Sequence, residues 1–101
     1  MAGITIKRES DAAGGRYVAV VDRLESEMTF KWGKRGGKTV MSIDHTGVPG
    51  ELSGRGVGLA LVAHAVEDAR REGFRIVPLC SFVKLMIDRH KDWRDVLASG
   101  S

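Results

Sequence analysis

The sequence predicts one domain of the mixed α/β (α+β) class, with antiparallel strands first and a strand–helix–strand crossover and a C-terminal helix after them. Short β-branched and aromatic runs alternate with glycine-rich turns in the first half. An amphipathic stretch of helical period follows a glycine-rich loop, and a short apolar run comes directly after it. The length of 101 residues and the 43% hydrophobic content suit one domain and leave no room for a second. We assign the domain to residues 1–98 and expect the small, polar residues 99–101 to form a disordered tail.

Several stretches of the first half have the composition and alternation of strands. They cover Ile4–Arg8, Arg16–Asp22, Leu24–Trp32 and Thr39–Val48. Apolar and charged residues alternate cleanly along the third stretch, so one face of the sheet is expected to be solvated. The polar, glycine-rich residues 33–38 are expected to form a hairpin loop before the fourth strand. Simple alternation places Met41, Ile43 and His45 together on one face of that strand.

The second half predicts two helices around a short buried strand. A helix over Val57–Glu72 has an apolar stripe and ends at Gly73, where a glycine is typical of a helix end. The stripe is formed by Leu59, Val62, Ala63, Val66 and Ala69. Arg75–Cys80 returns as a buried strand, which makes the unit a parallel crossover. Ser81 is expected to cap a last helix over residues 82–89.

Composition and charge exclude several classes of protein. The 16 basic and 13 acidic residues give a formal charge of +3, which is too balanced for a disordered acidic or basic chain. The single cysteine, Cys80, cannot form an internal disulfide, so neither a disulfide-stapled module nor a multi-cysteine zinc domain is expected, and we assign no metal site. Because there is no long apolar run and the N-terminus is polar, we expect a cytoplasmic protein with no membrane partner.

A glycine-rich loop, Gly54-Arg55-Gly56-Val57-Gly58, lies between a predicted strand and the long helix. Backbone N–H groups with no Cβ in the way can bind an anion at such a helix N-terminus. The loop is not a P-loop, which needs Lys-Ser/Thr after its second glycine, and not the dinucleotide fingerprint, which needs a small residue where Leu59 stands. The alternative is a tight turn that only allows close packing between the helix and the sheet.

The segment Ser53–Val62 resembles the pyrophosphate loop of the GNAT N-acetyltransferases, a Gln/Arg-x-x-Gly-x-Gly/Ala pattern that opens a helix. Residues 43–49, 77–83 and 87–90 resemble the minimal, stand-alone YjdJ-type branch of that superfamily. The resemblance implies a GNAT-like mixed sheet with splayed parallel strands and transfer of an acetyl group from acetyl-CoA to an amine. A protein lysine, a polyamine or a small amine would each serve as the acceptor, and the oligomeric state is left open.

The resemblance also implies which residues hold the coenzyme. Ser53, Gly54, Arg55, Gly56, Val57 and Gly58 would bind the pyrophosphate, Thr46 and Val48 would hold the pantetheine arm, and Arg89 and His90 would meet the phosphates or form a solvated helix end. Two positions depart from the family pattern. Ser53 replaces the first Gln or Arg of the loop, and Met86 stands where the branch often has a tyrosine that can donate a proton.

Two residues are candidates for the chemistry. His45 could accept the proton of the amine, since an unperturbed imidazole titrates near pH ~6.5, or it could be a hydrogen-bonded structural residue. Cys80 lies between a strand and a helix N-terminus, where its thiol pKa can be lowered, so it could form an acetyl-cysteine intermediate. Buried cysteines are also often inert, and direct attack of the amine on acetyl-CoA is the alternative route.

Two other functions compete with acetyl transfer. One is an acyl-CoA-binding protein or sensor without catalysis, which the absent tyrosine favours. The other is a small nucleic-acid-binding module, suggested by the basic residues 34–38. Nucleic acid is the less favoured partner, because Phe30 and Trp32 fall in the apolar stripe of their strand and not on a basic surface.

Overall fold

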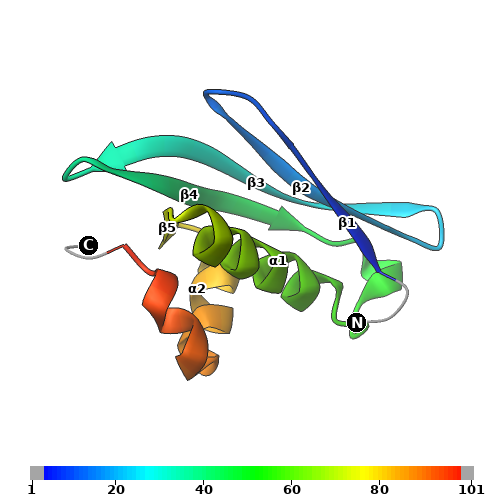
Figure 1. The fold of residues 1–101 in the computed structure, drawn as a ribbon. Coiled ribbons are helices and arrows are strands. Elements are labelled where there is room, and N and C mark those ends of the chain that lie inside the picture. Colours follow the sequence, from blue (N-terminus) through cyan, green and yellow to red (C-terminus); the bar gives the residue numbers. More distant parts are fainter. Residues whose placement is uncertain (1–3, 99–101) are drawn as a thin grey trace.

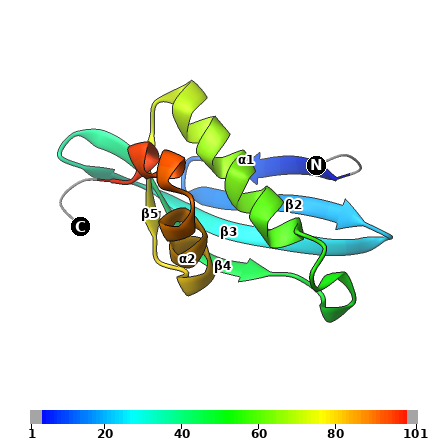
Figure 2. The same ribbon diagram turned by 90° about the horizontal axis from the view of Figure 1, so that it is seen from below.

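The fold is a single mixed sheet with helices on one face (Figure 1, Figure 2). A computed structural model of the chain describes residues 4–98, so residues 1–3 and the predicted tail at 99–101 lie outside the described part. The five strands follow one another across the sheet in chain order. They are β1 (Thr5–Ser10), β2 (Gly14–Val21), β3 (Leu24–Arg35), β4 (Lys38–Gly47) and β5 (Arg75–Pro78). Pairs from β1 to β4 are antiparallel and β4–β5 is parallel, which confirms the predicted α+β class.

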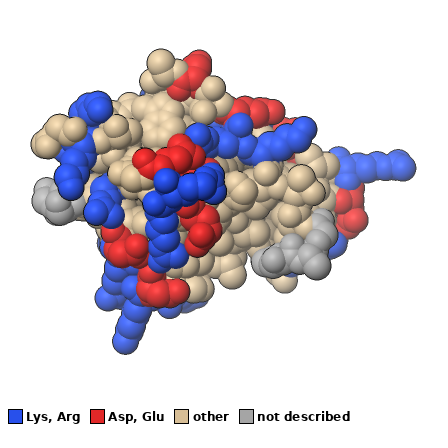
Figure 3. All heavy atoms as spheres, viewed as in Figure 1, with Lys and Arg blue, Asp and Glu red and all other residues tan. Residues whose placement is uncertain are grey.

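The helices cover the face of the sheet that carries the core. α1 (Val57–Glu72) links β4 to β5 and forms the predicted crossover, and α2 (Ser81–Arg89) follows β5. Short 3-10 helices cover Gly50–Leu52 and Lys91–Val96. No helix within residues 4–98 has the length and apolar character needed to cross a membrane. Basic and acidic side chains are interspersed on the surface in Figure 3.

The β3–β4 hairpin is tighter than the sequence suggests. Its strands run on to Arg35 and start again at Lys38, so the turn consists of Gly36 and Gly37. Both have positive φ, +55° and +81°, which is the backbone of a turn whose twist matches that of paired strands. The predicted six-residue loop is therefore mostly strand.

A bulge in β4 changes which side chains face the helices. Phe30 pairs with Ile43 and Thr29 pairs with His45, so Asp44 is an extra residue in β4. An extra residue of this kind shifts the alternation of all residues that follow it. His45 therefore lies on the face of Thr29, away from the helices.

The bulge overturns the predicted grouping of His45 with Met41 and Ile43. Met41 and Ile43 are fully buried, whereas His45 is exposed on the opposite face. Thr46 pairs with Met28 and takes the side that faces the helices. The prediction failed because a rule of simple alternation cannot detect an inserted residue in the strand.

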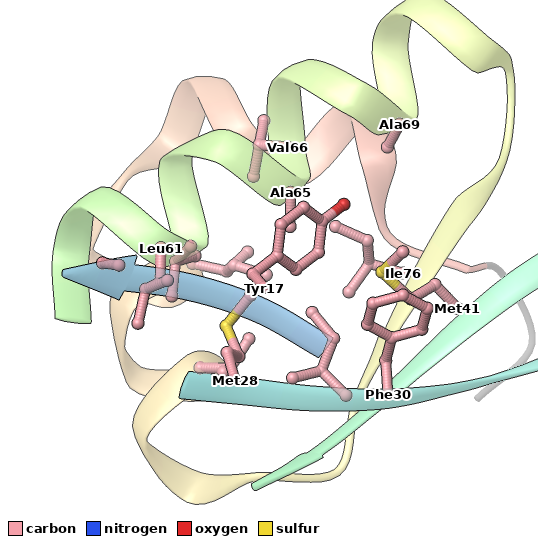
Figure 4. Close-up of a cluster of buried hydrophobic side chains, with 14 of the residues drawn as sticks. Tyr17, Met28, Phe30, Met41, Leu61, Ala65, Val66, Ala69 and Ile76 are labelled. Carbon is pink, nitrogen blue, oxygen red and sulfur yellow. The ribbon is translucent and has the colours of Figure 1, made fainter. Parts of the chain in front are cut away.

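The core lies between the sheet and α1 (Figure 4). From the sheet it takes Tyr17, Met28, Phe30, Met41 and Ile76, and from α1 it takes Leu61, Ala65, Val66 and Ala69. The predicted stripe of α1 is correct at Val62, Val66 and Ala69 but is rotated, since Leu59 and Ala63 are only half-buried. Asp68, which is only 2% exposed, takes part in the buried face instead.

Asp68 accepts hydrogen bonds that tie α1 to the first strands. Its Oδ2 lies 2.8 Å from the hydroxyl of Tyr17 and 3.2 Å from a guanidinium nitrogen of Arg8, and Arg71 contacts its other oxygen. Burial, followed by the hydrogen bond to Asp68, raises the pKa of Tyr17 far above its usual range. The phenol is therefore a fixed donor to the carboxylate.

The last described residues add to the sheet. Leu97 bridges Ile76 in parallel, and the N–H of Ala98 donates to the carbonyl of Ile76 at 2.9 Å.

The start of α2 differs from the prediction. Ser81 is the first residue of α2, and Cys80 takes the N-cap position, with no side-chain hydrogen bond there. The predicted capping by Ser81 is therefore wrong.

Candidate functional site

The parallel strands β4 and β5 separate beside the helices. Their pairing ends at Ile43 and Pro78, and a last hydrogen bond of 2.9 Å joins the N–H of Cys80 to the carbonyl of Ile43. Pro78 cannot donate to a ladder, which suits the place where pairing ends. In the part of the chain that the structure describes, nothing pairs with this side of β4 beyond Ile43. The rest of β4, as far as Gly47, therefore offers an open strand edge, as the splayed arrangement predicts.

A pocket of about 340 Å³ lies on the helix side of this opening. It is bounded by the residues directly after β4, the glycine loop, the start of α1 and the first turns of α2, and neither Thr46 nor Cys80 belongs to its lining. Six of the residues predicted to bind coenzyme line it: Val48, Ser53, Gly54, Gly56, Val57 and Gly58. Leu52, Phe82 and Met86 line it as well, although the sequence analysis gave none of them a binding role. Phe82 follows Cys80 closely within the family-like segment, so the motif itself was the signal for it.

The backbone conformation of the glycine loop explains why two of its positions are occupied by glycine. Gly54 and Gly56 have φ of +78° and +76°, a left-handed conformation that favours glycine. Gly56 is the N-cap of α1, and no side chain caps this helix end. The first bond of the helix runs from the N–H of Ala60 to the carbonyl of Gly56. The N–H groups of residues 57–59 therefore have no acceptor inside the helix and are available to an anion.

Glycine is required at position 58 by packing and not by backbone conformation. A Cβ built on Gly58 would lie only 2.7 Å from the ring of Phe82. Gly58 therefore allows α1 and α2 to approach each other at the wall of the pocket. The contact joins two helices, so it differs from the packing of helix on sheet that the sequence analysis gave as the alternative, and it applies to one glycine of the three.

Arg55 does not line the pocket. Its guanidinium is paired with Asp22 at 2.5 Å, and Asp22 belongs to the turn between β2 and β3. The Arg55 side chain is half exposed, at 49%. It must leave Asp22 in order to reach a phosphate bound at the loop.

Cys80 stands at the point where β5 leaves the sheet. Its Sγ lies 3.6 Å from the hydroxyl of Thr46, which the bulge has turned to the helix side. Burial acts to raise the pKa of the Cys80 thiol, but the nearby N–H of Val83, the Thr46 hydroxyl and the N–H of Phe82 favour the thiolate and outweigh burial. The net effect is a lowered pKa, which favours the nucleophilic thiolate.

Comparison with known proteins decides the family. The profile described as GCN5-related N-acetyl-transferase matches residues 16–96. The chain belongs to the GCN5-related N-acetyltransferase family. The solution NMR structure of a GCN5-like candidate N-acetyltransferase from Staphylococcus aureus is similar to it, with 30% sequence identity and a TM-score of 0.70, covering 100% of this chain and 94% of that one. The search of curated proteins gives no match.

The other residues predicted for a GCN5-related N-acetyltransferase site lie away from the pocket. His45 is exposed on the opposite face of the sheet. Arg89 ends α2 and His90 follows it, at the far end of that helix from Cys80. The ring of His90 stacks on Trp93 at 4.1 Å between centroids, and its Nδ1 lies 2.7 Å from the carbonyl of Met86. Among the described residues, Arg89 and His90 do not join the pocket lining.

The lowered pKa of Cys80 gives a direct prediction. Alkylation of the wild-type protein by iodoacetamide should have its midpoint at a pH below the ordinary thiol value of 9.0. Replacing Thr46 with valine removes one hydrogen bond that favours the thiolate, so the midpoint should move upward. The rate of alkylation is followed against pH by intact mass. Equal midpoints in both proteins would contradict the role of Thr46.

Proposed function

We propose that this chain binds acetyl-CoA and transfers its acetyl group to an amine. The observation that carries the proposal is the pocket that lies between the free N–H groups at the start of α1 and the residues directly after the open edge of β4, with the Cys80 thiol in contact with Thr46 on that edge. A pyrophosphate carries negative charge and suits the helix N-terminus. The pantetheine arm contains amides and suits an unpaired strand edge. Membership of the family supports acetyl-CoA as the donor.

One group of residues would bind the coenzyme. Backbone groups of the loop from Gly54 to Gly58 would hold the pyrophosphate, and Thr46 and Val48 flank the edge that takes the arm. Arg55 would add a charge-assisted contact after leaving Asp22. Ser53 lines the pocket with only a hydroxyl, so the backbone carries more of the phosphate binding than in relatives with Gln or Arg there.

Cys80 supports a covalent route. Its thiolate would attack the thioester carbonyl, the CoA thiolate would leave and take up the thiol proton, and an acetyl-cysteine would remain. An amine would then attack this acetyl group, losing a proton and returning the Cys80 thiol. The lowered pKa favours the first step. The other route is direct attack of the amine on acetyl-CoA, which needs no covalent residue.

A non-catalytic acyl-CoA binder is the second candidate. Met86 lines the pocket at the position where relatives often have a tyrosine, and a thioether cannot donate a proton. Nucleic acid binding has less support. Phe30 is 2% exposed and Trp32 packs against the same core, so neither presents a free ring for stacking on bases.

The test combines calorimetric titration of acetyl-CoA with intact mass. We expect the wild type to bind acetyl-CoA and to gain one acetyl group, and Cys80→Ala to bind without gaining it. Ser81→Ala is the matched control, because this exposed neighbour makes no side-chain hydrogen bond among the described residues. It should behave like the wild type.

Three other outcomes of this test would reject the proposed function or favour one of its alternatives. Lack of binding at near-millimolar acetyl-CoA would reject the proposed function. Binding with amine acetylation that persists in Cys80→Ala would leave the direct route. Binding with neither acetyl gain nor transfer to any amine would favour the non-catalytic binder.

A further inference from the structure

The outer face of the sheet, which no helix covers, has its charges separated along the strands. Arg35 of β3 and Lys38 of β4 lie at the β3–β4 turn, whereas Glu25 and Glu27 lie towards the start of β3. Both glutamates pair with Arg16, at 3.0 and 2.9 Å. Within residues 4–98, neither Arg35 nor Lys38 forms an ion pair. The basic end of this face therefore keeps its charge.

A cavity of about 180 Å³ lies at this basic end. Arg35 is opposite Lys38 in the hairpin register, and Arg75 of β5 pairs with Val40, which lies two residues after Lys38. The three basic residues therefore share one face of the sheet, and all three line the cavity. Val40 and Ala98, which are 5% and 8% exposed, form an apolar part of the lining. Cationic groups beside an apolar wall attract an anion more strongly than they do in open water.

The carboxylate in this lining is already neutralised. Asp95 accepts hydrogen bonds of 3.1 and 2.8 Å from the guanidinium of Arg70, and this pairing lowers the pKa of Asp95. Arg75 donates to the backbone carbonyl of Asp95 at 2.6 Å, which uses one of its N–H donors. In the described part of the chain Arg75 forms no ion pair. The cavity therefore presents cationic groups of three strands without a carboxylate of its own to balance them.

We propose that this cavity binds the phosphate group of a phosphate monoester. The site is separate from the one assigned to acetyl-CoA, because the β3–β4 hairpin and the glycine loop lie at opposite ends of the molecule (Figure 1, Figure 2). The inference therefore goes beyond the proposed function and does not depend on it.

The donor set favours a monoester over other anions. A monoester phosphate carries about 1.5 to 2 negative charges at pH 7 and has three strong acceptor oxygens. The planar guanidinium groups of Arg35 and Arg75 suit paired contacts to phosphate oxygens, and the ammonium of Lys38 adds a point charge. A carboxylate has a single charge and two oxygens, and a phosphodiester also has a single charge. Either of these anions would leave more of the positive charge unbalanced.

The experiment maps phosphate binding on the full chain. Phenyl phosphate is titrated into ¹⁵N-labelled protein at physiological salt, which screens attraction between distant exposed charges. We expect amide shifts at residues 35, 38 and 75, and an affinity about fivefold lower in Lys38→Gln, the upper size for one exposed ion pair. Lys34→Gln is the matched control. It removes the same charge from the same hairpin, but Lys34 does not line the cavity and donates to the hydroxyl of Thr39 at 3.1 Å.

A second set of probes tests the kind of anion. Benzoate and dimethyl phosphate each carry one charge and should bind more weakly than phenyl phosphate. A short neutral peptide that contains phosphoserine distinguishes the two sources of a monoester. Tighter binding of the peptide supports a phosphorylated protein as the carrier of the phosphate, and tighter binding of phenyl phosphate supports a small molecule.

Several results would overturn the site. They are the absence of shifts at millimolar phenyl phosphate, shifts confined to residues 54–58, and equal affinity for all three anions. Equal weakening in Lys38→Gln and Lys34→Gln would mean that net charge alone attracts the anion. Arg35→Gln provides a second variant at another exposed lining residue, and the same spectra show whether each variant is folded.

Discussion

Gly54→Glu is expected to weaken acetyl-CoA binding by roughly 100-fold, whereas Gly36→Glu should leave it unchanged. Gly54 lines the pocket at the predicted pyrophosphate position. A carboxylate about 5 Å from a phosphate charge costs about 3 kcal/mol at the effective dielectric of a protein surface. Because about 1.4 kcal/mol corresponds to a tenfold change in affinity, the expected loss is large.

Gly36 makes this a matched comparison. Both glycines have positive φ, +78° and +55°, and a Cβ built on either would meet nothing within 4 Å. The two variants therefore carry the same new charge and similar backbone strain, but Gly36 lies in the β3–β4 turn, away from the pocket. Titration calorimetry of acetyl-CoA, with circular dichroism to confirm folding, measures the difference. Equal weakening in both variants would mean that strain or net charge, and not the loop, governs binding.

The sequence was sufficient for the order of the strands but not for the face of each residue in β4. Hairpin signals such as Gly36-Gly37 and the crossover at the glycine loop determine which strands are neighbours. The bulge at Asp44 has no signal in the residues of β4 themselves. It depends on how β4 pairs with β3, since Phe30 meets Ile43 in the core. For this reason simple alternation predicted the wrong face for His45.

The candidate site shows the same division between local and long-range information. Gly54 and Gly56 were predictable because a local motif needs left-handed backbone at these positions. The packing role of Gly58 depends on Phe82, which arrives from another helix. The partner of Arg55 is Asp22, far earlier in the chain and in a different hairpin. Contacts of this kind require the tertiary arrangement and cannot be read from spacing.

Asp68→Ala is expected to lower the free energy of unfolding by about 3 kcal/mol, because a buried phenol loses the charged acceptor of its hydrogen bond and Arg8 loses one of its ion pairs. Asp68 is 2% exposed and Tyr17 is fully buried, so the phenol would lose its acceptor without gaining water. Arg8 would lose one of its two carboxylate partners and keep the other, Glu72, at 2.9 Å. For a domain of this size the change corresponds to a fall in Tm of roughly 15 °C.

Urea unfolding of the wild type, Asp68→Ala and Glu67→Ala measures the effect. Glu67 is the neighbouring carboxylate, with an exposed side chain paired only with Arg70 among the described residues, so its loss should change stability by no more than about 0.5 kcal/mol. A loss below about 1 kcal/mol in Asp68→Ala would contradict the buried network. The same unfolding measured with acetyl-CoA tests whether the network also shapes the pocket. A ligand that binds only the folded state adds the same increment to every protein of equal affinity. An equal increment in Asp68→Ala would mean that Asp68 holds α1 on the sheet without setting the position of its N-terminus, which the glycine loop and the Gly58–Phe82 contact then determine alone.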